Sequence, residues 1–451
     1  MKTQTKHSFT EGRILLPLIQ FALPVLLALF LQAMYGAVDL LVVGKFADSA
    51  DVSAVSTGSQ LLATVTTVIA SFSMGTTILL GQQLGKGEGE KGGDTIGASV
   101  VLFGAIGVVL TILMVLCAPL LASIMNAPAE AFDKTVSYIR ICGGGILVII
   151  AYNMIGSVFR GIGDSTTPLI TVAIACVFNI AGDLFLVDVV HLGAAGAAIA
   201  TVGAQALSVF LSFFLIRSKK LPFTLRKEQL RFVPSIAGKV ASLGAPIALQ
   251  DFLVGLSFLI LLAIINALGL TASAGIGVAE KVAAFIMLMP SAFMQSLAAF
   301  VAQNYGAGKL DRGRKALHYA IGMALLLGVI ISWFTRFHGD LLSGIFTNDA
   351  DVIAASWDYL RAYAIDCVLT PIFFCYIGFF NGIGRTRFVM IQGLIGAFCV
   401  RVPVAFFMSR IEPVTLFHIG LSTPCSSLVQ IALCLGYMLW LRKHVMKINK
   451  R

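Results

Sequence analysis

Residues 82–87 read QQLGKG, and residues 303–308, which lie 221 positions later, read QNYGAG. The same offset relates FRGIG at 159–163 to FNGIG at 380–384. Each motif follows an apolar stretch, and each is rich in glycine, as expected for a turn that ends a helix. Matches that recur at one fixed offset indicate that the chain is built from two copies of one unit.

A third match at this offset pairs residues 138–140, YIR, with residues 359–361, YLR. It lies between the first two matches, and three separated matches at one offset support a duplication. We therefore predict a duplicated architecture with an N-lobe at 1–216, a cytoplasmic linker at 217–236 and a C-lobe with a basic tail at 237–451.

The composition indicates an integral membrane protein. Of the 451 residues, 58% are hydrophobic and only 12% are charged, whereas about a quarter are charged in an average soluble protein. Apolar windows long enough to cross a bilayer predict twelve spans. They lie near residues 14–43, 53–83, 94–120, 134–160, 166–188, 192–217, 237–268, 272–305, 312–336, 350–380, 385–409 and 414–443.

Six predicted spans fall in each half. An even number of spans returns the chain to the side where it started, so the two halves have parallel orientation. The predicted fold class is an all-α integral membrane protein with twelve transmembrane helices arranged as two parallel-repeat six-helix bundles. Two such bundles around a central cleft describe a transporter better than a pore or a receptor.

The formal net charge of +10 first suggests a nucleic-acid partner. Most of the 32 Lys and Arg residues, however, fall in loops on one side if both termini are cytoplasmic, as the positive-inside rule requires. These charges would face anionic lipid headgroups. We therefore expect no nucleic acid, membrane lipids as partners, a multi-pass location in the inner (plasma) membrane, and a monomer.

The fifth predicted span contains FNIAGDLFLV at 178–187, where Asn179 and Asp183 are four residues apart and share one helix face. Asp39 lies in the first span. The positions one repeat later are apolar: Ile260, Val400 and Val404. Duplication thus kept the scaffold, but only the N-lobe carries this acid–amide–acid set.

Acids within spans are expensive and are usually functional. Two carboxylates close together in a low dielectric cannot both ionise easily, so Asp39 and Asp183 would titrate as a unit. With Asn179, they are candidates to bind a proton or to hold Na⁺ between carboxylate and amide oxygens. The alternative is that each acid caps or hydrogen-bonds a broken helix near the surface.

Three further polar residues, Tyr138, Asn153 and Thr201, lie in spans 4 and 6. They are candidates to line a substrate cavity beside the acids, although hydrogen bonding between helices explains such residues equally well. Tyr138 has a repeat partner in Tyr359, which favours a structural role shared by both halves.

The C-lobe has its own charges in spans, Asp251, Asp366, Lys281 and Arg401, and Glu280 lies next to Lys281. Neighbours in sequence do not face each other on a helix. One interpretation is a charge-compensated set that pairs Asp366 or Asp251 with Lys281 or Arg401 and stabilises the bundle. The other is a second ion site.

Motifs for other chemistry are missing from the sequence. GKGEGEKGGD at 85–94 is not a GxxxxGK[ST] nucleotide loop, and neither HExxH nor GxSxG occurs. The eight cysteines form no CxxC and lie mostly in apolar segments, as small core residues do. We predict no enzyme activity, no cofactor, and no metal other than a possible Na⁺ at the N-lobe acids.

The sequence resembles the multidrug and toxic compound extrusion (MATE) family over essentially its whole length, and within it the DinF-like branch. The resemblance rests on the 6+6 spans and on these segments: AVDLLVVGKF at 37–46, GQQLGKGE at 81–88, AQNYGAGK at 302–309, FRGIGDSTTP at 159–168 and FNGIGRTRF at 380–388. It implies an antiporter that exports cationic or amphiphilic organic compounds in exchange for H⁺ or Na⁺, while its two lobes rock between outward-open and inward-open states.

The resemblance also implies roles for residues. In the DinF-like branch the acid–amide–acid set of the N-lobe is the coupling site, here Asp39, Asn179 and Asp183. A branch with a C-lobe cation site has a Glu in span 7 and an Asp in span 10. Asp251 and Asp366 lie on the corresponding helices in a different register, which leaves a C-lobe Na⁺ site open.

Three other classes of protein compete with this interpretation. A flippase for lipid-linked precursors or other amphiphiles would favour a large basic cavity, for which Arg140, Arg361 and Arg401 are the available cations. A membrane-embedded enzyme would need clustered catalytic residues, whereas the six histidines are scattered. A channel would need filter elements in both halves, whereas the polar set occurs in one.

Overall fold

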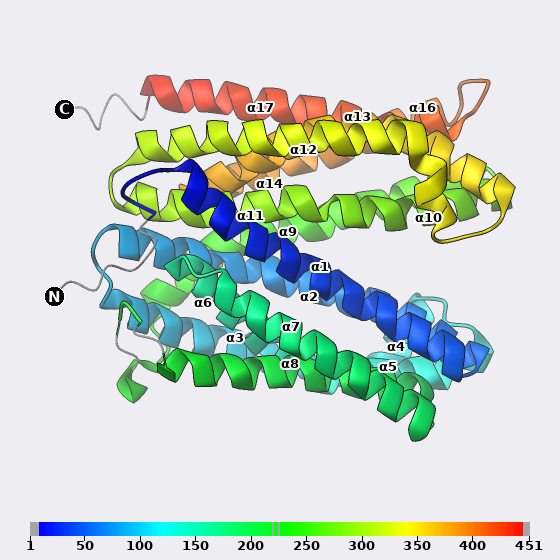
Figure 1. Cartoon of the computed structure of the whole chain (residues 1–451), viewed down its shortest axis with the longest axis horizontal. Helices are drawn as coiled ribbons and strands as arrows, with labels where there is room; N and C mark the ends of the chain where they lie inside the picture. Colours follow the sequence, from blue (N-terminus) through cyan, green and yellow to red (C-terminus); the bar gives the residue numbers. More distant parts are fainter. Residues whose placement is uncertain (1–8, 219–220, 224–225, 445–451) are drawn as a thin grey trace. The chain divides into compact units, whose positions relative to one another are not determined.

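The computed structural model describes residues 9–218, 221–223 and 226–444. Across these residues the chain forms helices and no strands (Figure 1). The helices of the first half are α1 (Leu15–Phe46), α2 (Ser49–Gly85), α3 (Lys91–Leu116), α4 (Ala118–Ile124), α5 (Phe132–Gly144), α6 (Ile146–Ile162), α7 (Thr166–Asp183) and α8 (Gly193–Ser218). Those of the second half are α9 (Pro234–Asn266), α10 (Leu270–Ile286), α11 (Leu288–Gly306), α12 (Leu310–Gly344), α13 (Ala350–Gly382), α14 (Thr386–Leu394), α15 (Val402–Met408), α16 (Leu416–Gly420) and α17 (Ser422–His444).

The predicted membrane helices are confirmed. Eleven helices of the described residues are long and apolar enough to cross a bilayer, and one bent pair brings the number to twelve. The bent pair joins residues 129–144 to α6 at an angle of 50°, where the sequence analysis predicted one continuous span. The break falls at Gly145, the last of three consecutive glycines, and glycine is a poor helix former.

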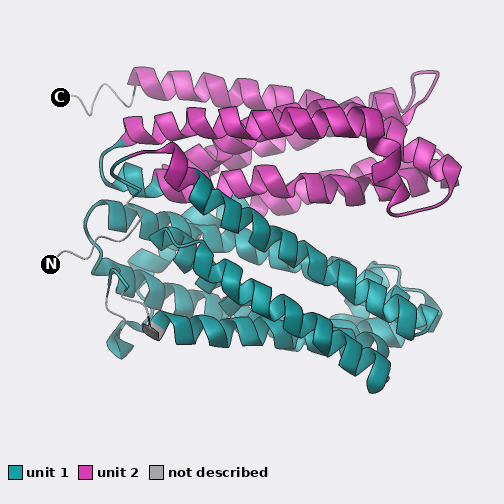
Figure 2. Cartoon of the chain, in the orientation of Figure 1, with its two compact units in different colours: residues 1–12, 19–248, 302–309 teal, residues 13–18, 249–301, 310–451 magenta. Residues whose placement is uncertain are grey.

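The chain divides into two compact units (Figure 2). The first unit contains residues 1–12, 19–248 and 302–309, and the second contains 13–18, 249–301 and 310–451. These units correspond broadly to the predicted lobes, but they do not divide at the linker. Parts of that linker, residues 219–220 and 224–225, and the basic tail from residue 445 onward lie outside the described residues.

The beginning of α9 belongs to the first unit because small residues let its backbone approach α2. A Cβ atom on Gly244 would collide with the carbonyl of Phe72, and one on Gly75 would collide with the carbonyl of Val240. Close backbone approach through small residues is the usual way in which membrane helices pack. The charges of the linker, from which the lobe boundary was predicted, do not indicate this contact between α9 and α2.

The repeated glycine motifs have a physical explanation. Gly163 and Gly384, which are related by the 221-residue offset, both adopt the left-handed conformation, with φ of 85° and 78°. Gly87 and Gly308 form a second such pair, with φ of 77° and 72°. Only glycine takes this conformation at no steric cost, so both copies keep glycine where each helix ends.

A reciprocal contact links the two QxxG turns. A Cβ atom on Gly85 would collide with the carbonyl of Gln303, and one on Gly306 would collide with the carbonyl of Gln82. The two contacts exchange equivalent residues of the repeat, as in a contact across a two-fold axis. The duplicated sequence therefore folds back on itself at these turns.

The equivalent tyrosines lie in the cores of their own units. Tyr138 is 1% exposed and packs in the core of the first unit, and Tyr359 is 3% exposed in that of the second. All eight cysteines are free thiols.

Candidate functional site

Three helices of the first unit bring the predicted acids together. Asp39 comes from α1, Asn179 and Asp183 from the last turns of α7, and Thr201 from α8. The side chains are almost fully buried, with 2% of Asp39 and none of Asn179 or Asp183 exposed. The structure thus joins the three predicted coupling residues to one of the three predicted cavity residues. We call these four residues the acid cluster.

The contacts inside the acid cluster centre on Asp39. The hydroxyl of Thr201 donates to Oδ2 of Asp39 at 2.8 Å. The carboxyl group of Asp183 and the amide of Asn179 lie close enough to Asp39 to act on its carboxyl group, although neither forms a hydrogen bond with it among the described residues. Two ionised carboxylates cannot donate to each other, so this contact is satisfied when a proton or another cation lies between them.

The rest of the acid cluster makes few hydrogen bonds. Apart from the contact with each other, Oδ1 of Asp39 and both carboxyl oxygens of Asp183 accept none from the described residues. Buried oxygens without donors cost free energy, and within a membrane they indicate a function rather than a structural support. The coupling role predicted for the acid cluster stays a prediction, and these unpaired oxygens are the observation that supports it.

The backbone is irregular at this point. The α-helix α7 ends at Asp183 and continues as a π-helical turn, Leu184–Val189. Short π-helical segments inside α-helices are rare and are frequent at functional sites. The irregular turn follows directly after the acid that the repeat lacks in the second half.

The two other predicted cavity residues differ in their placement. Tyr138 packs its ring against Gly58 and lies close enough to Asp39 and Asp183 to interact with them electrostatically. Asn153 is turned toward its own helix, where its amide donates to the carbonyl of Ile149 at 2.8 Å. Of the three, only Asn153 shows no contact with the acid cluster.

Tyr35 is a residue of this region that the sequence analysis missed. It lies one helical turn before Asp39 and shares its face, and its hydroxyl donates to the carbonyl of Val172 in α7 at 2.9 Å. This bond ties the two acid-bearing helices together. The i, i+4 spacing from Asp39 was the available signal.

A second group that the sequence analysis missed lies at one end of the first unit. Lys134 of α5 forms ion pairs with Asp48 at 2.7 Å and with Asp51 at 2.8 Å. Asp51 also accepts from the backbone amide of Ala194 at the start of α8. The Lys134 ammonium lowers the pKa of the exposed Asp48 carboxyl to about 2. This group joins the three helices α2, α5 and α8.

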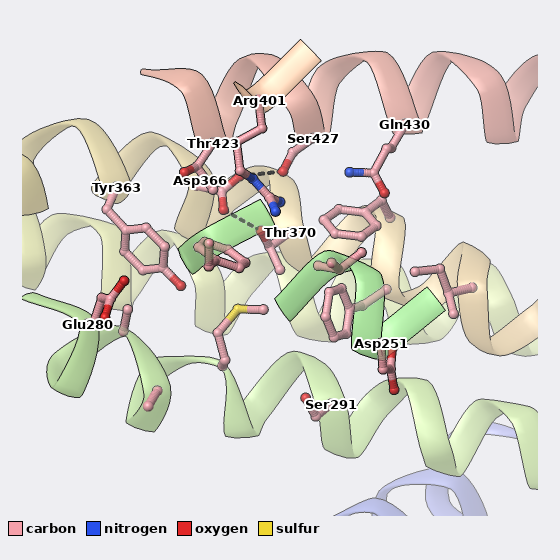
Figure 3. Close-up of a pocket in the computed structure, with 18 of the residues that line it drawn as sticks. Asp251, Glu280, Ser291, Tyr363, Asp366, Thr370, Arg401, Thr423, Ser427 and Gln430 are labelled. Carbon is pink, nitrogen blue, oxygen red and sulfur yellow. Dashed lines mark hydrogen bonds between the residues drawn. The ribbon is translucent and has the colours of Figure 1, made fainter. Parts of the chain in front are cut away.

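The second unit contains a cavity of about 430 Å³ (Figure 3). Asp366 of α13 lies on its wall and accepts hydrogen bonds from the hydroxyls of Thr370 at 2.8 Å and Ser427 at 2.5 Å. Both carboxylate oxygens therefore have a hydroxyl partner. This is the reverse of Asp183, whose oxygens have only Asp39.

Arg401 lines the same cavity. It ends a π-helical segment, Ile395–Arg401, and its Nη1 donates to the hydroxyl of Ser257 at 2.9 Å. Its guanidinium lies 4.1 Å from the ring centroid of Phe258. It interacts electrostatically with Asp366, although no hydrogen bond joins them.

The remaining predicted charges of the second unit lie apart from Asp366 and Arg401. Asp251 and Glu280 line the cavity, and in Figure 3 both lie away from Asp366 and Arg401. Lys281 is exposed and lies over the ring of Phe346 instead. Within the described residues, no group of three or more His, Cys, Asp or Glu side chains is placed to hold a metal ion.

Membrane-spanning helices in two repeated units, with buried polar clusters inside the spans, define a multi-pass membrane transporter. The family model described as MatE matches the chain twice, at residues 24–185 and 246–407. The chain therefore belongs to the multidrug and toxic compound extrusion family, whose members are transporters and not enzymes. The two matches coincide with the two halves of the repeat.

Similar proteins cover nearly the whole chain. The probable multidrug resistance protein YpnP of Bacillus subtilis is 26% identical over 89% of this chain and 90% of its own. The probable multidrug resistance protein NorM of Thermotoga maritima is 25% identical over 90% of this chain and 86% of its own. Among solved structures, an outward-facing multidrug resistance MATE transporter matches all of both chains, with a TM-score of 0.90 at 19% identity. That last likeness shows the shared fold.

Proposed function

We propose that this protein is a secondary antiporter that exports cationic or amphiphilic organic compounds in exchange for H⁺ or Na⁺. The relatives are named as multidrug resistance proteins, which supports small organic substrates. The observation that carries the coupling proposal is the buried contact between Asp39 of α1 and Asp183 of α7. This contact favours H⁺ as the coupling ion, because one proton lets the two carboxyl groups bond to each other.

The mechanism is competition at the acid cluster. When Asp39 and Asp183 are ionised, their region of the first unit attracts a cationic substrate. Protonation from outside removes this charge, weakens the binding of the substrate and releases it. The coupling ion can shift the outward/inward equilibrium only if it binds the two states with different affinity.

A change in α1 would provide that difference. The helix contains Pro24, which removes one backbone hydrogen bond, and Gly36, whose Cα faces open space and lies one turn before Asp39. A bend at either point would move Asp39 relative to Asn179 and Asp183 on α7. Protonation and the exchange of access between the two sides would then be linked through one helix.

The proposed orientation follows from the charges of the loops. The distribution of Lys and Arg supports cytoplasmic termini and a location in the inner (plasma) membrane. With this orientation an inward gradient of H⁺ or Na⁺ would drive export.

The test uses purified protein in proteoliposomes loaded with the cationic dye rhodamine 123. A pH gradient and a Na⁺ gradient are imposed separately on the wild type and on Asp183→Asn, which keeps the volume of the side chain. We expect dye movement that follows the pH gradient and is lost in the variant. Movement that follows only the Na⁺ gradient would replace H⁺ by Na⁺, and full movement in Asp183→Asn would refute coupling at the acid cluster.

A further inference from the structure

A short segment before α1 packs onto one end of the first unit. Residues 9–12 belong to that unit, although they are part of no helix. Phe9 is 2% exposed, and its ring packs edge-on against Phe21 of α1, with 5.2 Å between the ring centroids. The sequence gives no warning of this contact, because one phenylalanine in a polar segment has no periodicity. We call residues 9–12 the strap.

The strap is held by the repeated turn that ends α11. The side-chain amide of Asn304 donates to the carbonyl of Phe9 at 3.1 Å, and the ammonium of Lys309 donates to the carbonyl of Thr10 at 3.0 Å. Backbone carbonyls outside a helix need donors from elsewhere, and here two side chains of the QNYGAGK segment supply them. The strap and residues 304–309 therefore hold each other in place.

The end of α6 completes the socket around the Phe9 ring. A Cβ atom on Gly163 would lie 3.3 Å from both the ring of Phe9 and the amide nitrogen of Gln303. Gln303 in turn donates to the carbonyl of Gly161 at 2.9 Å. The FRGIG turn of the first half, the QNYGAG turn of the second half and the strap thus meet at one aromatic ring.

The segment that the strap holds is the end of a helix shared between the two units. Residues 302–309 belong to the first unit, whereas the earlier part of α11, up to residue 301, belongs to the second. Alternating access moves such units as bodies. A helix shared between them must then release one of its ends or bend.

We propose that the strap is a latch, which holds the end of α11 on the first unit and must release before the protein opens on this side of the membrane. The proposed orientation puts this side in the cytoplasm. Release loses the burial of one ring and two hydrogen bonds, and segments with so few attachments are the ones that open in conformational changes. The latch rests on the proposed export function and adds a control of access to it.

Hydrogen exchange measures the latch directly in the full-length protein in nanodiscs. The backbone amide of Lys309 donates to the carbonyl of Asn304 at 2.8 Å, so its exchange reports opening of the turn that the strap holds. In Phe9→Ala we expect peptides covering residues 302–309 to exchange about tenfold faster than in the wild type, because burial of one such ring corresponds to at least that factor in an equilibrium constant.

The matched control is Phe223→Ala. Phe223 is another buried aromatic residue of a loop in the same unit, 7% exposed, and it packs in a separate apolar cluster between α2, α3 and α6. This variant should leave exchange at residues 302–309 unchanged. If Phe9→Ala does not fold, Lys309→Met tests the same latch, because it removes only the exposed bond to Thr10. Exchange should then rise about threefold.

A reversible crosslink tests whether transport needs the release. The double variant Phe9→Cys/Asn304→Cys is treated with a reducible bis-methanethiosulfonate that links the two thiols. Gradient-driven movement of rhodamine 123 should stop when the link is made and return when it is reduced. The wild type, whose eight cysteines meet the same reagent, and the single variant Phe9→Cys are the controls.

Three results would overturn the latch: unchanged exchange at residues 302–309 in Phe9→Ala or in Lys309→Met, an equal rise in Phe223→Ala, or full transport by the crosslinked double variant. Hydrogen exchange needs neither a gradient nor a substrate. A wild type that moves no dye would therefore refute the export function, while the exchange of residues 302–309 would still decide whether the strap holds them.

Discussion

The two units use the same helix of the repeat with charges of opposite sign. In the first unit, Asp183 ends α7 and a π-helical turn follows. In the second unit, a π-helical segment ends at Arg401, whose repeat equivalent is Ile180, three residues before Asp183. Among the described residues, no group donates a hydrogen bond to the carboxyl oxygens of Asp183, and the Nε of Arg401 has no acceptor. The two π-helical segments occupy different repeat positions, since residues 395–401 correspond to 174–180 and not to 184–189. Each copy therefore has its own irregular turn and its own polar group beside it.

This difference limits the proposed coupling to one unit. The acid cluster is proposed to accept a positive charge, and the cavity of the second unit holds a positive charge of its own. A symmetric transporter with the same ion site in both units does not fit these contacts.

The largest effect is expected from changing an acid to its amide in each unit. Asp183→Asn should reduce proton-coupled export to the level of protein-free vesicles, because the carboxyl pair can no longer share and release a proton. Asp366→Asn should keep the coupling, because this carboxylate is already satisfied by two hydroxyls. Proton uptake during export, followed with a pH-sensitive dye inside proteoliposomes, measures both. Loss of coupling in Asp366→Asn alone would move the coupling site to the second unit.

The reciprocal contact between the two QxxG turns predicts that equivalent substitutions in the two copies destabilise the protein equally. Gly85→Ala and Gly306→Ala each force a Cβ into a backbone carbonyl of the other turn, and overpacking of this kind costs about 1–3 kcal/mol. Thermal unfolding in detergent should show a lower apparent Tm for both variants, by similar amounts.

The matched controls for this pair are Gly104→Ala and Gly322→Ala. Both glycines lie within helices, and a Cβ on either would meet no atom within 4 Å. These variants should leave the apparent Tm unchanged or raise it, since alanine favours the helix. A fall in Tm for one QxxG glycine without the other would show that the contact is not reciprocal.

A smaller effect on stability is expected at one repeat position, where the two units carry Thr201 and Ser422. Thr201 donates to Asp39, whereas the hydroxyl of its equivalent, Ser422, is buried and has no hydrogen-bond partner among the described residues. Thr201→Val should destabilise the protein by about 1 kcal/mol, and Ser422→Ala should be neutral or slightly stabilising. Chemical or thermal unfolding of the two variants under one condition decides this, and equal losses would contradict it.

The smallest effect concerns the ends of the helices. The pKa of Asp48 is lowered to about 2 by Lys134, so its stabilising contribution is complete above the ordinary aspartate pKa of about 4 and is lost as the pH falls toward 2. Asp48→Asn should therefore lower the apparent Tm slightly at pH 6, with the difference from wild type vanishing near pH 2. Asp349→Asn, at the N-cap of α13, is the control, because Asp349 forms no ion pair within the described part of the chain. A difference for Asp48→Asn that persists at pH 2 would show that the loss is steric.

Much of the fold and part of the candidate site could be predicted from the sequence. Hydrophobic windows fix the spans because a bilayer admits only long apolar helices, and the offset of 221 residues reveals the duplication. Asp39, Asn179 and Asp183 stood out because acids inside spans are rare. Tyr35 was missed because a tyrosine within a span has no such rarity, although its spacing from Asp39 placed it on the same face.

Other features depend on contacts between distant segments. From the sequence, Asn153 and Thr201 were equal candidates for the cavity. In the structure the amide of Asn153 bonds to its own helix, whereas the hydroxyl of Thr201 bonds to Asp39. It also treated Lys281 and Arg401 as equivalent partners for an acid, and only Arg401 lines the cavity with Asp366. The rotation of each helix about its axis decides these cases, and that rotation is set by packing against neighbours.

By itself, therefore, the sequence determined the class of protein, the number of spans, the repeat and the acids of the first unit. These follow from local properties: hydrophobicity, glycine conformation and the cost of charge in a membrane. The tertiary structure decided which polar groups meet, which carboxylates already have donors, and where a cavity with a fixed guanidinium lies. Such facts depend on distances between helices far apart in the chain, and hydropathy and spacing along one helix do not encode those distances.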